Sequence, residues 1–294
     1  QIWRLMEAGT EDDITHLALA DWNRVWIYAD RLRRTRDAGG HWSPLPFVSG
    51  KGLQSVSMGS TTTGWARGSQ SKLLKTNRSG STWVEQIDTA YGLRTLEAVD
   101  TQHAWILYSS SLQRTIDGGQ TWETVDLGLD NARDLDFVNP DRGWLISSSQ
   151  VFVTTDGGST WTPQSAPSAG YLGVDFADDK HGWIMATVSG QRLWLMTENE
   201  GQTWAQVGEP SEALATTSMD FADQDHGWVI QHVPDTYYDQ FLVMGTTDSG
   251  MHWQPAWRSG QHRRLDFVDA LEGWVVGGDG WILYTRDGGV TWSQ

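Results

Sequence analysis

The sequence predicts an all-β fold, a seven-bladed β-propeller of four-stranded antiparallel blades. One phrase, Thr-x-Asp-x-Gly-x-Thr-Trp, recurs about every 40 residues, and a second tryptophan, usually after glycine, recurs in step with it. Such self-similarity is typical of propellers and solenoids, in which one unit cannot bury its apolar faces alone. The 294 residues divided among seven copies leave 42 for each, which suits one blade. The closing tryptophans of the phrase are Trp42, Trp83, Trp122, Trp161, Trp204, Trp253 and Trp292, and the second-strand tryptophans are Trp26, Trp65, Trp105, Trp144, Trp183, Trp228 and Trp274.

The unit at residues 134–163 illustrates the order of strands within one blade. Apolar and polar residues alternate at its start, as expected of a first strand, and turn residues follow at 139–143. Further strands begin at Trp144, Val151 and Trp161, with an Asp-Gly-Gly turn before the last of them. The other units repeat this order, so almost no helix is expected.

The repeated phrase has a local structural role in this interpretation. Its aspartate can accept backbone N–H groups, its glycine tolerates positive φ, and its threonines can bond across the hairpin. The closing tryptophan is expected to pack between sheets. An acid repeated on five blades favours a structural over a catalytic role. The acid position holds Asp37, Asp117, Asp156, Asp248 and Asp287, with Arg78 in the second unit and Asn199 in the fifth.

We expect one domain over residues 1–294. Only two residues follow Trp292, too few for a full outer strand. The segment Gln1–Met6 is strand-like, so we expect it to pair with the last blade and to protect an exposed edge. A missing C-terminal strand is the competing explanation. The expected segments are a closing strand and linker at 1–13 and blades at about 14–50, 51–91, 92–130, 131–168, 169–211, 212–258 and 259–294.

These residues carry a family resemblance over essentially the whole chain. The pattern resembles the Asp-box, or BNR, repeat. The combination Phe-x-Asp, Gly-Trp and Thr-x-Asp-Gly-Gly-x-Thr-Trp resembles the Ycf48/HCF136-like photosystem II assembly and stability factors. This resemblance implies a non-enzymatic, extracytoplasmic scaffold (periplasmic, lumenal or secreted, its signal removed) that binds a protein or peptide client. It does not imply a photosynthetic host.

Charge and composition exclude several other classes of protein. The formal net charge is −16, which would repel nucleic acid and anionic lipid. The chain has no cysteine, and therefore neither disulfides nor thiolate chemistry. No run of 18 apolar residues predicts a transmembrane helix. We expect a monomer without cofactor or metal.

The sixth unit carries the longest insertion, and this insertion is the first candidate for a client-binding surface. The 25 residues from Trp228 to Trp253 form the longest such interval in the chain. Tyrosine, tryptophan and arginine, which are enriched in binding hot spots, occur in this insertion and at the start of the seventh unit. A solvated loop with paired surface charges is the alternative. The candidate residues are Asp235, Tyr237, Tyr238, Asp239, Trp257, His262, Arg263 and Arg264.

Two further sets of residues occupy equivalent positions in several units. Eleven residues before the second-strand tryptophan stand Arg94, Arg133 and Arg263, which could bind an anion or acidic peptide or could pair with nearby carboxylates. Eight residues before it stand acids that could attract a cation, although we favour hydrogen bonds to the neighbouring blade. These acids are Glu97, Asp136, Asp175, Asp220 and Asp266.

Three other functions compete with the scaffold. A sialidase would need an assembled arginine triad and a tyrosine nucleophile, and no complete set is visible. A xyloglucan-cleaving glycosidase forms its cleft between two propellers, whereas this chain has repeats for one. The motifs HExxH, Walker A and Gly-x-Ser-x-Gly are absent. A glycan-binding propeller would use exposed aromatic platforms, for which the candidates are Tyr91, Tyr171, Tyr237, Tyr238 and Trp257.

Overall fold

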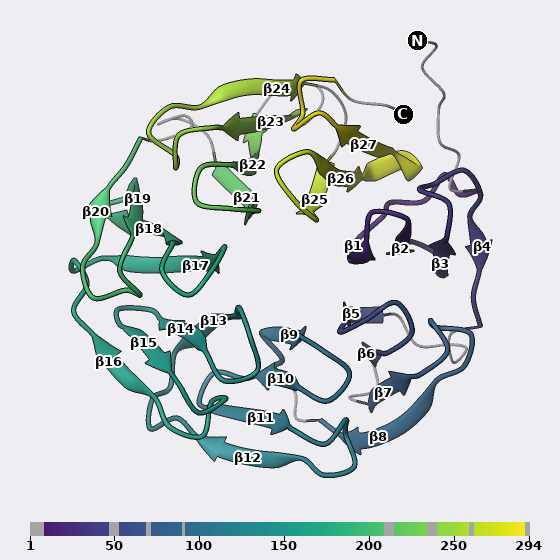
Figure 1. Ribbon diagram of the computed structural model, residues 1–294, viewed down its shortest axis with the longest axis horizontal. Coiled ribbons are helices and arrows are strands. Elements are labelled where there is room, and N and C mark those ends of the chain that lie inside the picture. The colour runs from purple at the N-terminus through teal and green to yellow at the C-terminus, as the bar shows by residue number, and fades with distance from the viewer. Residues whose placement is uncertain are drawn as a thin grey trace. The chain divides into compact units, whose positions relative to one another are not determined.

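The computed structural model describes residues 9–46, 53–68, 72–89, 92–208, 215–233, 240–258 and 262–291. This described part holds 27 strands in seven antiparallel sheets, with one short 3-10 helix (Figure 1). The predicted fold class, an all-β propeller of seven blades, is confirmed. The chain divides into two compact units, Gln1–Phe47 with Gly208–Gln294 and Val48–Val207.

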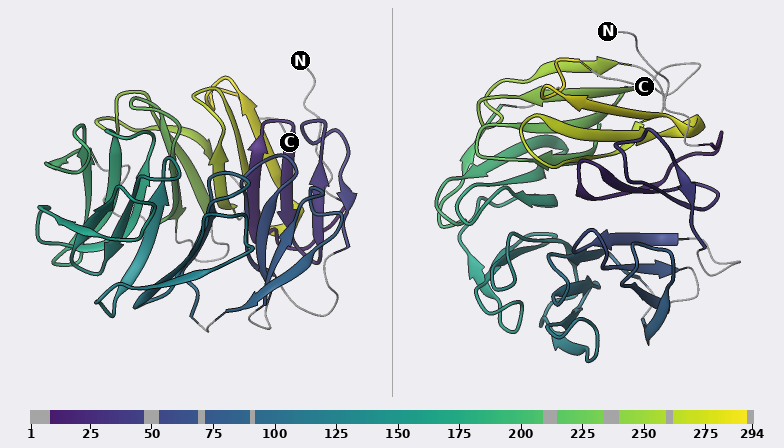
Figure 2. Two further views of the ribbon diagram at one scale, coloured as in Figure 1. Left: turned by 60° about the horizontal axis from the view of Figure 1, so that its bottom comes forward. Right: turned by 45° about the vertical axis from the view of Figure 1, so that its right-hand side comes forward.

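The unit Val48–Val207 contains four sheets of four strands. In each sheet, neighbours in sequence are neighbours in space, and all pairs are antiparallel (Figure 2). The first two sheets contain β5 (Leu53–Met58), β6 (Gly64–Gly68), β7 (Lys72–Thr76), β8 (Val84–Asp88), β9 (Thr95–Ala98), β10 (Ala104–Leu107), β11 (Ser111–Thr115) and β12 (Glu123–Asp126). The other two contain β13 (Ala132–Phe137), β14 (Gly143–Ser147), β15 (Val151–Thr154), β16 (Thr162–Gln164), β17 (Gly170–Phe176), β18 (Gly182–Val188), β19 (Gln191–Thr197) and β20 (Ala205–Gln206).

The other unit contains three sheets built in the same order. Two have four strands, and the third has three within the described residues. Their strands are β1 (His16–Asp21), β2 (Arg24–Tyr28), β3 (Leu32–Thr35), β4 (Ser43–Pro44), β21 (Ala215–Phe221), β22 (Gly227–Val233), β23 (Gln240–Thr246), β24 (Gln254–Arg258), β25 (His262–Phe267), β26 (Glu272–Gly277) and β27 (Ile282–Arg286), with the 3-10 helix η1 at Gly278–Gly280.

Steric contact within a blade explains why glycine precedes the second-strand tryptophan. In the sheet formed by β13 to β16, Phe137 on β13 pairs with Gly143 on β14, and Asp136 pairs with Trp144. A Cβ atom on Gly143 would lie 2.6 Å from the Phe137 ring, closer than real Cβ contacts come. The Gly-Trp pair therefore lets the phenylalanine ring lie across the start of the second strand.

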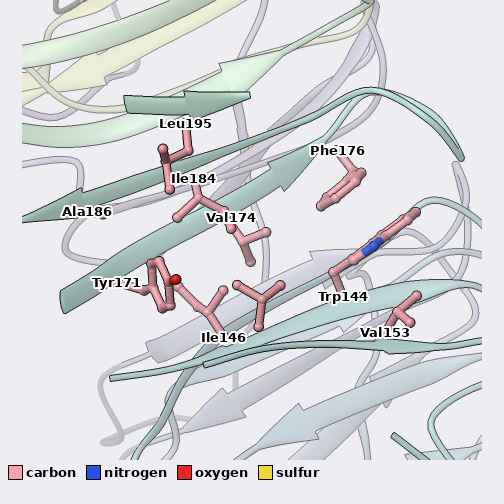
Figure 3. Close-up of a cluster of buried hydrophobic side chains, with 10 residues drawn as sticks. Trp144, Ile146, Val153, Tyr171, Val174, Phe176, Ile184, Ala186 and Leu195 are labelled. Atoms are coloured by element: carbon pink, nitrogen blue, oxygen red, sulfur yellow. The ribbon is translucent and has the colours of Figure 1, made fainter. Parts of the chain in front are cut away.

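Within each unit, second-strand tryptophans form the core between neighbouring blades. All seven are at most 2% exposed, whereas the described closing tryptophans are only half-buried. The second-strand series therefore lies at the centre of the inter-blade packing, and closing tryptophans such as Trp161 and Trp204 pack against the same clusters as partly buried side chains, as the sequence predicted. Trp144 stacks on Phe176 of the next sheet at a centroid distance of 3.5 Å (Figure 3). The closing Trp204 contacts the same phenylalanine only edge-on, at 6.0 Å.

The stacked tryptophan also donates a hydrogen bond to the next blade. Trp105 Nε1 donates to Gly157 O at 2.9 Å, and Trp144 Nε1 donates to Glu200 O at 3.1 Å. In the other unit, Trp228 Nε1 donates to Gly288 O at 3.1 Å. Each acceptor directly follows the acid position of the phrase, so the turn of one blade is held by the indole of the preceding blade.

The first and last sheets meet within the unit that contains both chain ends. Ile14 N donates to Gly277 O at 2.8 Å, and Ile14 packs with Val25, Trp274 and Val276. The predicted pairing of Gln1–Met6 with the last blade lies outside the described residues. The single domain over residues 1–294 stays a prediction.

Replacing Trp105 by phenylalanine is expected to destabilise the fold more than the same change at Trp161. Both rings contact Phe137, but Trp105 is buried and stacked at 3.6 Å, whereas Trp161 is half-buried and edge-on at 6.0 Å. We expect a loss of about 2–3 kcal/mol in the free energy of unfolding for Trp105→Phe and about 1 kcal/mol or less for Trp161→Phe. Urea denaturation measures both, and equal midpoints would contradict the assignment of the core to the second-strand series.

Candidate functional site

The turn of the repeated phrase is a closed set of hydrogen bonds. Thr154 Oγ1 donates to Asp156 Oδ1 at 2.8 Å and accepts from Gly158 N at 2.9 Å. Asp156 also accepts from Thr160 N and from Thr160 Oγ1, at 2.9 and 2.6 Å. The threonine hydroxyls thus bond inside the turn rather than across the hairpin, and the acid is held by its own loop.

Two units depart from the aspartate and still form the turn. Asn199 accepts from Thr197 Oγ1 at 3.0 Å and from Thr203 N at 2.9 Å, as an aspartate would. At the Arg78 position the turn retains the bond from Gly80 N to Thr76 Oγ1, at 2.9 Å. The turn therefore does not require a carboxylate, which fits a structural role for the phrase.

Acids on the first strands accept main-chain N–H groups from the next sheet. Glu97 Oε1 accepts from Phe137 N at 2.8 Å, and Asp136 Oδ2 accepts from Phe176 N at 2.7 Å. Asp220 accepts from Phe267 N, and Asp266 accepts from the backbone of Leu19. Asp175 occupies the same register, opposite Trp183 on the adjacent strand. Within the described residues, no three histidine or acidic side chains are grouped so that they could hold a metal ion.

Burial makes several of these carboxyl groups weak acids. It raises the pKa of Asp266 to about 7. Burial likewise raises the pKa of Asp134, which the sequence analysis did not single out, to about 6. The pKa of Glu97 rises well above its ordinary value through burial and through the neighbouring charge of Asp136. The sequence could have pointed to Asp134 as a further buried acid, because Asp134 stands only two residues before Asp136 on the same first strand.

The structure brings two of the predicted arginines to neighbouring strands of one unit. Arg94 directly precedes β9, Arg133 lies on β13, and both are exposed. The residues that follow the two arginines are hydrogen-bonded to each other, since Thr95 Oγ1 donates to Asp134 Oδ1 at 2.9 Å. Arg133 Nη1 donates to Tyr171 O at 3.0 Å. Among the described residues, neither arginine forms an ion pair.

The blade 6 candidates fall largely outside what can be located. Asp235, Tyr237, Tyr238 and Asp239 lie outside the described residues, as does Tyr91. His262 and Arg263 begin β25, and Arg264 follows them as an exposed residue.

Two of the predicted aromatic platforms do not lie open to solvent. Tyr171 is 1% exposed and donates its hydroxyl to Pro167 O, so the prediction of an exposed platform there is wrong. Trp257 is half-buried and packs against the cluster that contains Trp228 and Val243. Both rings pack against clusters of residues distant in sequence, which the local sequence does not reveal.

Comparison with known proteins agrees with the resemblance stated above. Residues 119–215, about a third of the chain, match the model of the family described as "Photosynthesis system II assembly factor YCF48". The resemblance to Ycf48-like proteins that the sequence predicts is thereby confirmed. No curated protein matches the chain.

Solved structures share the fold at low sequence identity. The structure "YCF48 bound to D1 peptide" is 20% identical with a TM-score of 0.72, and the match covers 97% of this chain and 95% of that one. YCF48 from Cyanidioschyzon merolae is 18% identical with a TM-score of 0.74, covering 97% and 99%. The GH74 enzyme of Niastella koreensis is 14% identical with a TM-score of 0.75. All of this chain matches that enzyme but spans only 55% of its length.

The described part of the chain contains no helix with the length and apolar character needed to cross a membrane.

Stability is expected to fall as pH rises from about 4 to about 7. Asp266 and Asp134 have folded pKa values of about 7 and about 6 against about 4 in the unfolded chain, so the folded state holds more protons in this window. Their contribution is fully present below pH 4 and is lost as pH rises through the folded pKa values. Below pH 4 stability is expected to fall as the pH falls. The reason is Asp117, whose pKa in the folded state is lowered to about 2, chiefly by the Thr121 hydroxyl.

The variant Asp266→Asn tests this dependence. We expect it to remove part of the slope between pH 4 and pH 7, with a gain relative to the wild type at pH 7 on the order of 2–3 kcal/mol. Thermal and urea denaturation across this range measure the slope. Asp126→Asn, at an exposed acid on β12, is the charge-matched control. An unchanged slope in Asp266→Asn would contradict the assignment.

Proposed function

We propose that this protein is a non-enzymatic scaffold that binds a protein or peptide client through the loops beside its first strands. The observation that carries the proposal is the pair Arg94 and Arg133. Both are exposed at the same register of adjoining sheets, and neither forms an ion pair with any described residue, on a chain of net charge −16. Exposed arginines without a carboxylate partner among the described residues favour an anionic partner on such an acidic protein.

The chemistry of arginine suggests what part of the client would be recognised. The planar guanidinium matches carboxylate geometry and can donate two parallel hydrogen bonds to it. An acidic side chain or a C-terminal carboxylate of a peptide is the group that two such arginines would bind. The solved YCF48 structure with a D1 peptide, similar to this chain in fold, supports a peptide as the kind of client.

The remaining residues of the client-binding surface complete this proposal, and Asp235, Tyr237, Tyr238 and Asp239 among them lie outside the described residues. They surround the insertion of the sixth unit and the start of the seventh. The acidic and aromatic members would contact neutral or basic parts of a client, since such types are frequent in hot spots. These residues are Asp235, Tyr237, Tyr238, Asp239, Trp257, His262, Arg263 and Arg264.

The family resemblance also supports placing the protein outside the cytoplasm, acting as a monomer. Its rigid blades would hold the client-binding loops in fixed positions, which is the usual division between scaffold and binding loop.

The absence of enzymatic activity is part of the same proposal. Acids in the repeated phrase are held inside their turns, and Glu97, Asp136, Asp220 and Asp266 accept main-chain N–H groups. A glycosidase requires one carboxyl to donate a proton and a second to act as nucleophile or base. We expect no turnover with a panel of chromogenic glycosides or with xyloglucan. Turnover that one carboxylate substitution abolishes would overturn this part.

Peptide selection tests the client-binding surface directly. A library of random peptides with free C-termini, selected on the wild-type protein, is expected to enrich acidic or carboxylate-terminated sequences. The double variant Arg94→Ala/Arg133→Ala should bind the selected peptides at least about tenfold more weakly, because each lost charged hydrogen bond costs about 1.5–3 kcal/mol. Titration calorimetry measures the ratio of the dissociation constants.

The matched control removes two other exposed arginines. Arg24 and Arg78 are both exposed, so Arg24→Ala/Arg78→Ala produces the same change of net charge. If both double variants weaken peptide binding equally, the loss of affinity comes from the change of net charge alone, and the assigned surface is contradicted.

A further inference from the structure

One position on the third strand holds a residue with a side chain in every blade except the sixth, where the residue is glycine. This register is the residue directly before the threonine that opens the phrase. From the first blade to the seventh it holds Arg34, Lys75, Arg114, Val153, Met196, Gly245 and Tyr284.

In the third blade this side chain is an arginine bound to the next blade's turn. Arg114 Nη1 donates to Asp156 O and to Gly157 O, both at 2.9 Å. Arg114 Nε and Nη2 donate to Glu123 Oε2, at 2.9 and 2.8 Å. Gly157 O therefore accepts from both Arg114 and the indole of Trp105, using the two lone pairs of a carbonyl oxygen.

In the second blade a lysine does the same. Lys75 Nζ donates to Gly118 O and lies 5.1 Å from the centroid of the Trp65 ring. A cation beside the second-strand tryptophan and on the turn carbonyl is thus a recurring arrangement in this fold.

The sixth blade has a groove at the corresponding place. The groove has a volume of about 360 Å³ and is lined by Gly245, Gln254, Pro255, Gly288 and Val290, among others. Gly245 pairs with Gln254 just as Arg114 pairs with Glu123, so Gln254 stands where the carboxylate partner stands in the third blade. Within the described residues, Gly288 O accepts a hydrogen bond from Trp228 alone.

We propose that this groove binds an arginine side chain of a partner protein, which takes the place that Arg114 takes in the third blade. The guanidinium would donate to the carbonyl oxygens of Asp287 and Gly288 and to the amide oxygen of Gln254. The site lies at the end of β23 opposite to the insertion of the sixth blade, so it is separate from the proposed client-binding surface.

The walls of the groove fit the rest of an arginine side chain. Val290 is 82% exposed, and Pro255 and Ala256 line the groove with it. These groups can cover the aliphatic stem while the charged head reaches the carbonyl oxygens. Carbonyl oxygens accept hydrogen bonds and do not donate them, so an anion finds no donor among the turn oxygens. Asp248 and His252 also lie in the wall, where Asp248 Oδ2 is bonded to His252 Nδ1 at 2.7 Å, so the carbonyl oxygens and the Gln254 amide oxygen carry the recognition.

Titration followed by nuclear magnetic resonance tests the proposal with a single residue as probe. N-acetyl-arginine methylamide is expected to shift the signals of Gly245, Gly288 and the Trp228 indole N–H, saturably and with a millimolar dissociation constant. N-acetyl-norleucine methylamide, which has the stem without the charge, should produce no saturable shift. N-acetyl-lysine methylamide distinguishes a guanidinium site from a general cation site, and equal or tighter lysine binding would overturn the arginine assignment.

Filling the groove from within is the decisive variant. Gly245→Arg/Gln254→Glu recreates the pair of the third blade and should abolish the shifts produced by the arginine probe. Gly245→Ala, which adds a Cβ without charge, is the matched control and should keep the binding. Unchanged probe binding in the arginine variant would overturn the proposal.

A second variant leaves position 245 on β23 unchanged. A Cβ at position 245 would lie 3.2 Å from the Trp228 ring, which is tight. Gln254→Leu leaves that contact unchanged and removes one acceptor, so it should weaken probe binding roughly fivefold to tenfold. Wild-type affinity in Gln254→Leu would contradict the proposed geometry.

Discussion

The stacked and hydrogen-bonded indole is the contact on which the blades of each unit depend. Its ring lies against the phenylalanine of the next sheet, and its N–H donates to the next blade's turn. One side chain thereby buries a large apolar area and satisfies its own donor, which a buried tryptophan needs. Burial of such a ring contributes up to about 4–6 kcal/mol. The turn must place a carbonyl oxygen at a fixed point, so the phrase and the tryptophan recur together.

The first strands face a second constraint, since a strand at the edge of a sheet has N–H groups without ladder partners. Acids of the preceding blade accept one such N–H at Phe137 and one at Phe176. A hydroxyl is sufficient for this role, because Ser57 Oγ accepts from Ala98 N at 3.0 Å. Burial raises the pKa of Glu97, Asp220 and Asp266, and a neighbouring carboxylate adds to the rise at Glu97 and Asp220. The acids are thus explained by blade-to-blade bonding, without a ligand.

The places where repeats differ are the places where function can reside. All seven blades bury this indole, and six of the seven carry a side-chain acceptor at the register of Asp136 on the first strand, so these positions serve the fold. Arg94, Arg133 and the glycine at position 245 are not needed by every blade. The third blade holds a cation at the turn, whereas the sixth blade has a groove at the same register.

The sequence by itself determined the number of blades, the strand order and the resemblance to Ycf48-like proteins. These follow from periodicity and turn chemistry, which are local and repeat with the chain. Only the tertiary structure decided that the second-strand tryptophans are fully buried whereas the closing ones are half-buried, and that Tyr171 is buried. It also decided which partners the inner acids bind and that a groove opens beside Gly245. Such features depend on which surface of the next blade covers a side chain, and the sequence pattern of a single strand does not predict that surface.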